Sequence, residues 1–201
     1  MITSMCKVLC VTNRRLCKGD YFRQIERIAQ ASPDGIIVRE KDLPEAEYAV
    51  LLSRVAEICQ KHGVPVIAHT FAHIAAKTGV DALHLPLGVL RELDTETRQQ
   101  FRLLGASCHS VADAQEAVRL GANYITAGHI FETDCKKGLA GRGLDFLRNV
   151  CTSVSVPVYA IGGISPENAP DVMKAGAAGV CIMSGFMQSD DPAALVATFR
   201  K

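Results

Sequence analysis

The chain has 201 residues, of which 48% are hydrophobic and 21% are charged. This composition excludes a disordered chain and suits one domain with a large core. The 22 Lys and Arg residues balance 21 Asp and Glu residues for a net charge of +1, whereas a nucleic-acid binder usually has a basic excess. No apolar run approaches the ~18 residues that a membrane span needs. We therefore expect neither nucleic acid nor membrane as a partner.

The chain carries an even number of cysteines: Cys6, Cys10, Cys17, Cys59, Cys108, Cys135, Cys151 and Cys181. A disulfide framework is typical of small secreted domains, and the absence of any C-x-x-C pair weakens zinc and thioredoxin-like interpretations. Several of these cysteines lie inside apolar runs, where a free thiol behaves as a small hydrophobic group. We expect reduced core thiols and a cytoplasmic protein.

Short apolar runs alternate with amphipathic segments along the whole chain. The runs predict buried strands at residues 7–12, 35–39, 65–68, 82–85, 102–107, 124–127, 158–161 and 179–183. The segments between and after them predict helices at residues 21–31, 45–62, 71–78, 95–101, 111–120, 144–154, 168–175 and 192–199.

Strict alternation of this kind predicts an α/β fold, a single (β/α)8 TIM barrel over residues 1–201. A doubly wound sheet is the alternative, but it needs a glycine-rich turn after the first strand, and no glycine occurs there before Gly19. In a barrel, the chemistry lies at the carboxyl ends of the strands.

Two glycine-containing segments at the ends of the last two predicted strands indicate a phosphate site. Gly162 and Gly163 follow the seventh strand, and Met183 and Ser184 end the eighth. Barrels often bind phosphate at these two loops, because backbone N–H groups approach the anion closely there. We expect these four residues to bind a phosphate group.

A long polar loop at residues 128–143 follows the sixth strand, and loops of this length are often lids or binding loops. His129 ends the strand, and Thr133 and Lys136 are suited to donate to a phosphate or carboxylate. Arg39 and Lys41, after the second strand, suit an anionic group as well. No pair of acids at strand ends is placed to hold a divalent metal, so we expect no metal and no cofactor.

The chain resembles the thiamine phosphate synthase superfamily across nearly its full length. The matching stretches are residues 37–41, 82–85, 105–110, 121–124, 160–164 and 183–184, and the resemblance implies a (β/α)8 barrel. The synthases place an Asn-Asp pair after the third strand and another Asp after the fourth, and these Asp residues bind magnesium. This chain has His69, Thr70 and Val89 at those positions.

The loop at residues 128–138, with Gly141-Arg-Gly143, resembles the TenI branch of the superfamily. This implies a thiazole tautomerase, an isomerase of thiamine biosynthesis that aromatises a dihydrothiazole carboxylate phosphate by proton transfer. The resemblance places the branch's catalytic histidine on His129, a residue type that titrates near neutral pH.

The expected ligand is a small thiazole phosphate, and a homodimer is left open. Ser107 and His109, with Arg39 and Lys41, are the candidates for orienting its carboxylate. Two alternatives remain at this stage: a magnesium-dependent thiamine phosphate synthase, and a regulatory TenI-like protein that binds a thiazole phosphate without turnover.

Overall fold

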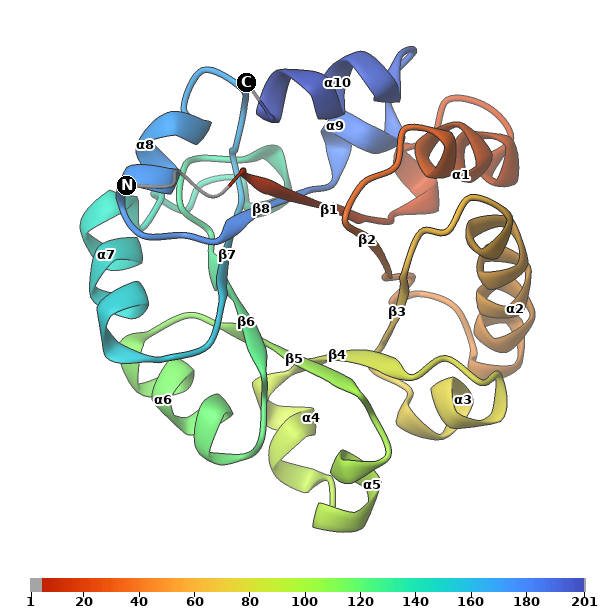
Figure 1. Ribbon diagram of the computed structural model, residues 1–201, viewed down its shortest axis with the longest axis horizontal. Helices are drawn as coiled ribbons and strands as arrows, with labels where there is room; N and C mark the ends of the chain where they lie inside the picture. Colours follow the sequence, from red (N-terminus) through yellow and green to blue (C-terminus); the bar gives the residue numbers. More distant parts are fainter. Residues whose placement is uncertain (1–4, 201) are drawn as a thin grey trace.

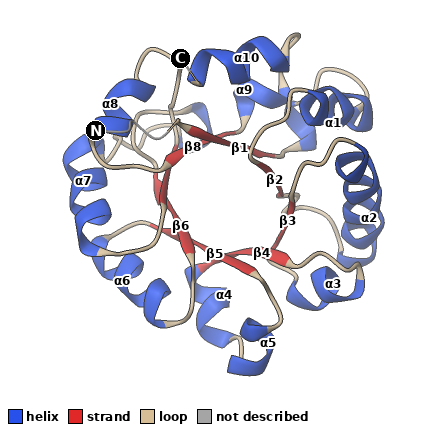
Figure 2. Cartoon of the chain, in the orientation of Figure 1, coloured by secondary structure: helices blue, strands red, loops and turns tan. Residues whose placement is uncertain are grey.

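Residues 5–200 are described by the structure, a computed structural model, and they form a closed barrel of parallel strands surrounded by helices (Figures 1 and 2). Neighbouring strands pair in chain order, and the last pairs with the first. The strands are β1 (Lys7–Val11), β2 (Gly35–Val38), β3 (Val66–His69), β4 (Ala82–Pro86), β5 (Leu103–Cys108), β6 (Tyr124–Gly128), β7 (Val158–Ile161) and β8 (Gly179–Ile182).

The helices form the outer layer of the barrel, as the ring of blue ribbons in Figure 2 shows. They are α1 (Tyr21–Gln30), α2 (Glu45–Lys61), α3 (Ala72–Lys77), α4 (Leu87–Glu92), α5 (Thr95–Gln99), α6 (Val111–Arg119), α7 (Gly143–Ser153), α8 (Ala169–Lys174), α9 (Ser184–Met187) and α10 (Pro192–Phe199). Two single 3-10 turns, η1 (Arg14–Leu16) and η2 (Asp134–Lys136), lie in loops.

The predicted barrel is confirmed, and closure between β1 and β8 excludes the doubly wound alternative. All eight predicted strands occur, with ends that shift by a residue or so. The sequence prediction missed α4 and α9, since six and four residues are too few to establish a helical period.

Two apolar layers hold the barrel together. The inner layer comprises the cluster Leu9, Val11, Ile37, Ile67, Ala82, Tyr124, Tyr159 and Cys181, which fills the barrel between the strands. Tyr124 fits there because its neighbour across the strand pair is Gly105, where a Cβ would lie only 2.1 Å from the tyrosine ring. The outer layer packs the strands against the helices, so most strand residues are buried on both faces, as in other parallel barrels.

The cysteines whose side chains are described are all free, and five of the seven are buried. Burial raises the pKa of the Cys59 and Cys108 thiols to about 12, which suits core groups rather than nucleophiles. Within residues 5–200, no helix combines the length and apolar character needed to cross a bilayer.

Candidate active site

A cavity of about 560 Å³ opens at the carboxyl ends of the strands. Every residue predicted to bind or transform a ligand lines it: Arg39, Lys41, Ser107, His109, His129, Thr133, Lys136, Gly162, Gly163, Met183 and Ser184. The topology explains this convergence, because all parallel strands of a barrel end on one face. We call this cavity the mouth.

The buried carboxylate of Glu40 sets the positions of its two neighbours in the chain, the cations Arg39 and Lys41. Glu40 is 3% exposed, and its carboxylate accepts hydrogen bonds from the Thr12 hydroxyl at 2.7 Å and from the Arg14 backbone N–H at 3.0 Å. The Thr12 hydroxyl oxygen also accepts from the Arg39 N–H at 2.9 Å. Glu40 therefore turns into the protein, and its neighbours Arg39 and Lys41 line the mouth.

Three cations that line the mouth, Arg39, Lys41 and Lys136, lie close enough together for their charges to interact. Partial burial lowers the pKa of Lys41, and the nearby charges of Arg39 and Lys136 lower it further. Across residues 5–200, none of the three forms an ion pair with an acid. Such a group of unpaired cations is stabilised by a multiply charged anion.

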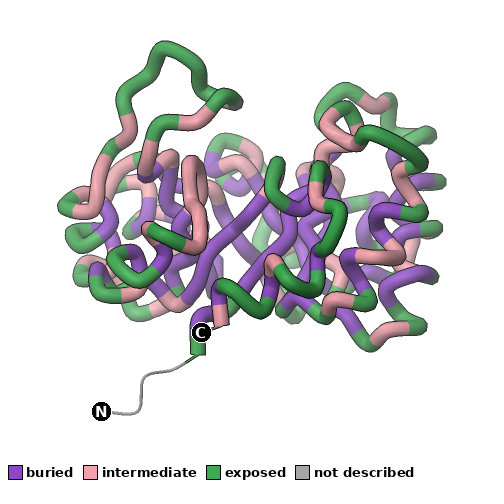
Figure 3. The backbone as a smooth tube through the Cα atoms, turned by 90° about the horizontal axis from the view of Figure 1, so that it is seen from above, coloured by how far each residue is buried: buried purple, intermediate pink, exposed green. Residues whose placement is uncertain are grey.

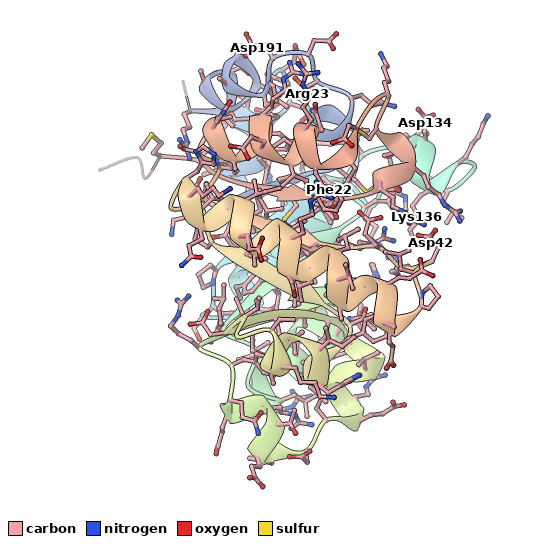
Figure 4. All side chains as sticks on the ribbon, turned by 90° about the vertical axis from the view of Figure 1, so that its right-hand side faces the viewer. Phe22, Arg23, Asp42, Asp134, Lys136 and Asp191 are labelled. Carbon is pink, nitrogen blue, oxygen red and sulfur yellow. The ribbon has the colours of Figure 1, made fainter. Side chains whose placement is uncertain are left out.

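Lys136 reaches the mouth from the loop between β6 and α7. Two backbone hydrogen bonds close the base of this loop, from Arg142 N to His129 O at 3.0 Å and from Gly143 N to Ile130 O at 2.9 Å. Figure 3 shows a largely exposed loop of this kind rising above the barrel. In Figure 4, Lys136 lies on the same edge as Asp42, the residue after Lys41. The loop thus extends one wall of the mouth.

Two glycines form the part of the mouth next to β7. Gly162 and Gly163 have φ angles of +96° and +66°, which side-chain-bearing residues rarely adopt. A Cβ on Gly162 would lie 2.4 Å from the Cβ of His129, and one on Gly163 would lie 2.4 Å from the carbonyl oxygen of Glu132. Glycine is therefore required for the tight contact with the loop after β6.

Backbone N–H groups are available at this end of the mouth. In the described chain, the N–H groups of Gly163 and Ser184 take no part in the hydrogen bonds of turns and loops. The predicted phosphate-binding residues therefore do lie together, with free donors beside them.

Two stacked histidines form the floor of the mouth. The rings of His69 and His84 lie 5.9 Å apart between centroids. His84 uses both ring nitrogens, one with the Tyr124 hydroxyl and one with the Ser107 hydroxyl, each at 2.9 Å. Burial lowers the pKa of His84 to about 3. Burial, followed by His84 and the cations of the mouth, lowers the pKa of His69 well below its usual value. Both rings are neutral near pH 7.

The positions where the synthases hold magnesium do not fit a magnesium ion here. The Thr70 hydroxyl is bonded to Nδ1 of His69 at 2.6 Å, and Val89 packs against the hydrophobic core outside the mouth. Asp113 is the one acid among the described lining residues, and its carboxylate accepts from the His109 N–H at 2.8 Å. In residues 5–200, no three His, Cys, Asp or Glu side chains converge to hold a metal, whereas magnesium prefers several oxygen ligands.

The sequence prediction missed residues that support or line the mouth. It did not identify Thr12, a buried residue directly after β1 that supports the mouth by bonding to Glu40 and to the Arg39 N–H, and whose place at a strand end was a usable signal. It also missed Arg91, which the unpredicted helix α4 brings to the mouth and which is bonded to Glu116 at 2.7 Å. His129 lines the mouth as expected, and one of its ring nitrogens lies 3.3 Å from the Leu139 carbonyl oxygen.

Comparison with known proteins corrects the predicted activity. The thiamine-phosphate synthase of Fusobacterium nucleatum is 31% identical over 192 residues, covering 92% of this chain and 91% of the relative. That of Chloroflexus aurantiacus is 32% identical over 201 residues, covering 96% and 91%. These relatives are named as synthases, so the predicted thiazole tautomerase and its isomerase chemistry are wrong, and the alternative of a synthase is favoured. The resemblance of the loop at residues 128–138 to the TenI branch therefore does not fix the reaction, and the differences at Thr70 and Val89 bear only on the metal positions.

Solved structures and a family model agree with this comparison. Thiamine phosphate pyrophosphorylase from Pyrococcus furiosus has a TM-score of 0.83 at 25% identity, covering 100% of this chain and 96% of that chain. A 3-hexulose-6-phosphate synthase matches at a TM-score of 0.69 and 21% identity, which shows the fold alone. The model for thiamine monophosphate synthase matches residues 8–186. The chain therefore belongs to the thiamine monophosphate synthase family.

Proposed function

We propose that this chain is a transferase of the thiamine-phosphate synthase type, which couples a pyrimidine diphosphate to a thiazole phosphate. The observation that carries the proposal is that the mouth holds two kinds of anion-binding group. Its lining includes three unpaired cations, here called the cationic end, and the residues after β7 and β8 with their free N–H groups, here called the glycine-lined end. A transferase that joins one diphosphate to one monophosphate needs two such ends.

The glycine-lined end is the proposed site of the thiazole phosphate. Gly162, Gly163, Met183 and Ser184 would surround the phosphate, with backbone N–H groups as donors. A monophosphate fits this end because its walls are backbone, and backbone donors bind phosphate oxygens without needing a counter-charge at each one. Thr133, on the loop, would close over the same ligand.

The cationic end is the proposed site of the diphosphate. In the coupling, the carbon–oxygen bond to the diphosphate breaks, and the leaving group takes the electron pair. The nitrogen lone pair of the thiazole forms the new carbon–nitrogen bond, which leaves the ring positively charged. Arg39, Lys41 and Lys136 would stabilise the negative charge that gathers on the departing diphosphate.

The remaining predicted residues then act through shape and hydrogen bonding. Quaternising a ring nitrogen consumes no proton, so the proposed reaction gives His129 no proton to move. Its contact with the Leu139 carbonyl makes it a positioning residue for the loop. Ser107 and His109 would line the space between the two ends. Ser107 is fixed by its hydrogen bond with His84, and Nδ1 of His109 lies 2.8 Å from the Gly128 carbonyl oxygen.

No step in this scheme uses a metal. The homodimer stays a prediction.

The test is direct coupling. The chain is incubated with pyrimidine diphosphate and thiazole phosphate, once with excess magnesium and once with a chelator, and thiamine phosphate is measured by chromatography. We expect product in at least one buffer, and we expect the Lys41→Met variant, which keeps an unbranched side chain of nearly the same length without its charge, to lose most of the rate. Absence of product in both buffers would refute the proposed function.

A further inference from the structure

The mouth combines a strong positive charge with a floor that carries no charge. His69 lies beneath the cations as a buried ring, 4% exposed. Its position is fixed at two points: its backbone N–H donates to the Tyr48 hydroxyl at 2.8 Å, and its Nδ1 is bonded to the Thr70 hydroxyl at 2.6 Å. The Tyr48 hydroxyl in turn donates to the Val38 carbonyl at 2.8 Å. These bonds join the ends of β2 and β3 just below the cationic end.

Thr70, whose hydroxyl is bonded to His69, holds an unusual backbone conformation. Its φ is +72°, a left-handed conformation that a β-branched residue rarely adopts. Its N–H donates to the His84 carbonyl at 3.1 Å, and its side chain is used by His69. A residue kept in such a conformation beside a cavity is often part of the working site. Here it places a neutral hydroxyl against the ring of His69, which itself lines the mouth.

The consequence for charge follows from the lining of the mouth. A carboxylate at this point would neutralise part of the positive charge and would bind an anion only through an intervening divalent cation. With neutral His69 and Thr70 in that place, the full charge of Arg39, Lys41 and Lys136 acts on the ligand. We propose that the mouth binds the diphosphate group directly through these three cations, without a divalent metal ion. This inference rests on the proposed function and defines how that site handles its leaving group.

The test measures binding of inorganic pyrophosphate to the full chain by isothermal titration calorimetry, in a chelator and in excess magnesium. For the unaltered chain, the affinity in the chelator is expected to equal or exceed the affinity in magnesium, because magnesium competes with the three cations for the anion. An affinity that rises sharply with magnesium would overturn the inference, and so would binding that is absent in the chelator.

The Thr70→Asp variant makes the test specific to the site. Asp tolerates the left-handed conformation better than Thr, so we expect the variant to fold. Its carboxylate should weaken pyrophosphate binding in the chelator by about tenfold to a hundredfold, by like-charge repulsion at an effective dielectric of ~20, and magnesium should restore it. Thr70→Asn, which has the same size without the charge, is the matched control and should bind independently of magnesium. Equal behaviour of the Asp and Asn variants would contradict the inference.

The two proposals fail in different ways. If pyrophosphate binds in the chelator but no coupling occurs in either buffer, the proposed function is wrong and the metal-free anion site stands. If coupling occurs only with magnesium and pyrophosphate binding follows the same pattern, the function stands and this inference is wrong.

Discussion

Acidification should destabilise the fold through the neutral histidines beneath the mouth, and His84 allows the size of the effect to be worked out. Both of its ring nitrogens are occupied by hydroxyl groups of the protein, and burial lowers its pKa to about 3 from an ordinary value of 6.5. The folded state therefore disfavours the proton that the unfolded state accepts. The contribution of neutral His84 to stability is fully present above its unfolded pKa and is lost as the pH falls below that value.

The magnitude follows from proton linkage. With pKa values of 6.5 unfolded and about 3 folded, lowering the pH from ~7 to ~5 removes about 2 kcal/mol of unfolding free energy through His84 alone. His69 acts in the same direction, because its pKa is also lowered by burial. The loss continues toward the folded pKa and then levels off.

The assay is urea unfolding, followed by circular dichroism at the two pH values, for the unaltered chain and for His84→Gln. Glutamine retains a donor and an acceptor for the two hydroxyl groups but does not titrate. Every other group titrates in both proteins, so the difference between their pH dependences isolates His84. We expect the unaltered chain to lose about 2 kcal/mol more than the variant between the two pH values. Equal losses would show that the buried imidazole is not the cause.

Three further predictions address the frame of the mouth. Tyr48→Phe removes the hydroxyl that joins the ends of β2 and β3, and urea unfolding should show a loss of about 1–3 kcal/mol. Gly163→Ala, with a Cβ 2.4 Å from the Glu132 carbonyl oxygen, should lower both the melting temperature and the affinity for inorganic phosphate; Gly19→Ala, with nothing within 4 Å, is the control and should change neither. Lys136→Gln should weaken pyrophosphate binding in a titration at low salt by about tenfold, with a smaller difference at high salt because exposed charges are screened.

The fold was accessible from the sequence because its signals are local. Each strand is a short apolar run such as residues 158–161, and the alternation with helices leaves few architectures open. Polar residues gather where those runs end, so the candidate residues of the mouth could be found without any knowledge of contacts. The short helix α4 escaped because its six residues follow β4 without a break, which left Arg91 unassigned.

The internal arrangement of the mouth could not be predicted because it depends on distant pairs. Glu40 turns inward to meet Thr12, which lies 28 residues earlier, and nothing in the run Arg39-Glu40-Lys41 distinguishes that from an exposed charge cluster. The occupied ring nitrogens of His84 depend on Tyr124, which lies 40 residues later.

The predicted activity failed for a different reason. Residue types at positions 69, 70 and 89 indicate which ion a site does not hold, but they do not specify which bond the protein makes or breaks. These positions bear instead on how the ligand's charge is balanced, as in the proposed metal-free site.

The most direct test of the proposed transfer is a stoichiometric measurement of both products. The chain is incubated with pyrimidine diphosphate and thiazole phosphate, and thiamine phosphate and released pyrophosphate are quantified in the same samples over time. A transferase with the proposed two-ended mouth should release one pyrophosphate for each thiamine phosphate formed, with both rates falling together in Lys41→Met. Pyrophosphate release without thiamine phosphate, or no release at all, would contradict the account.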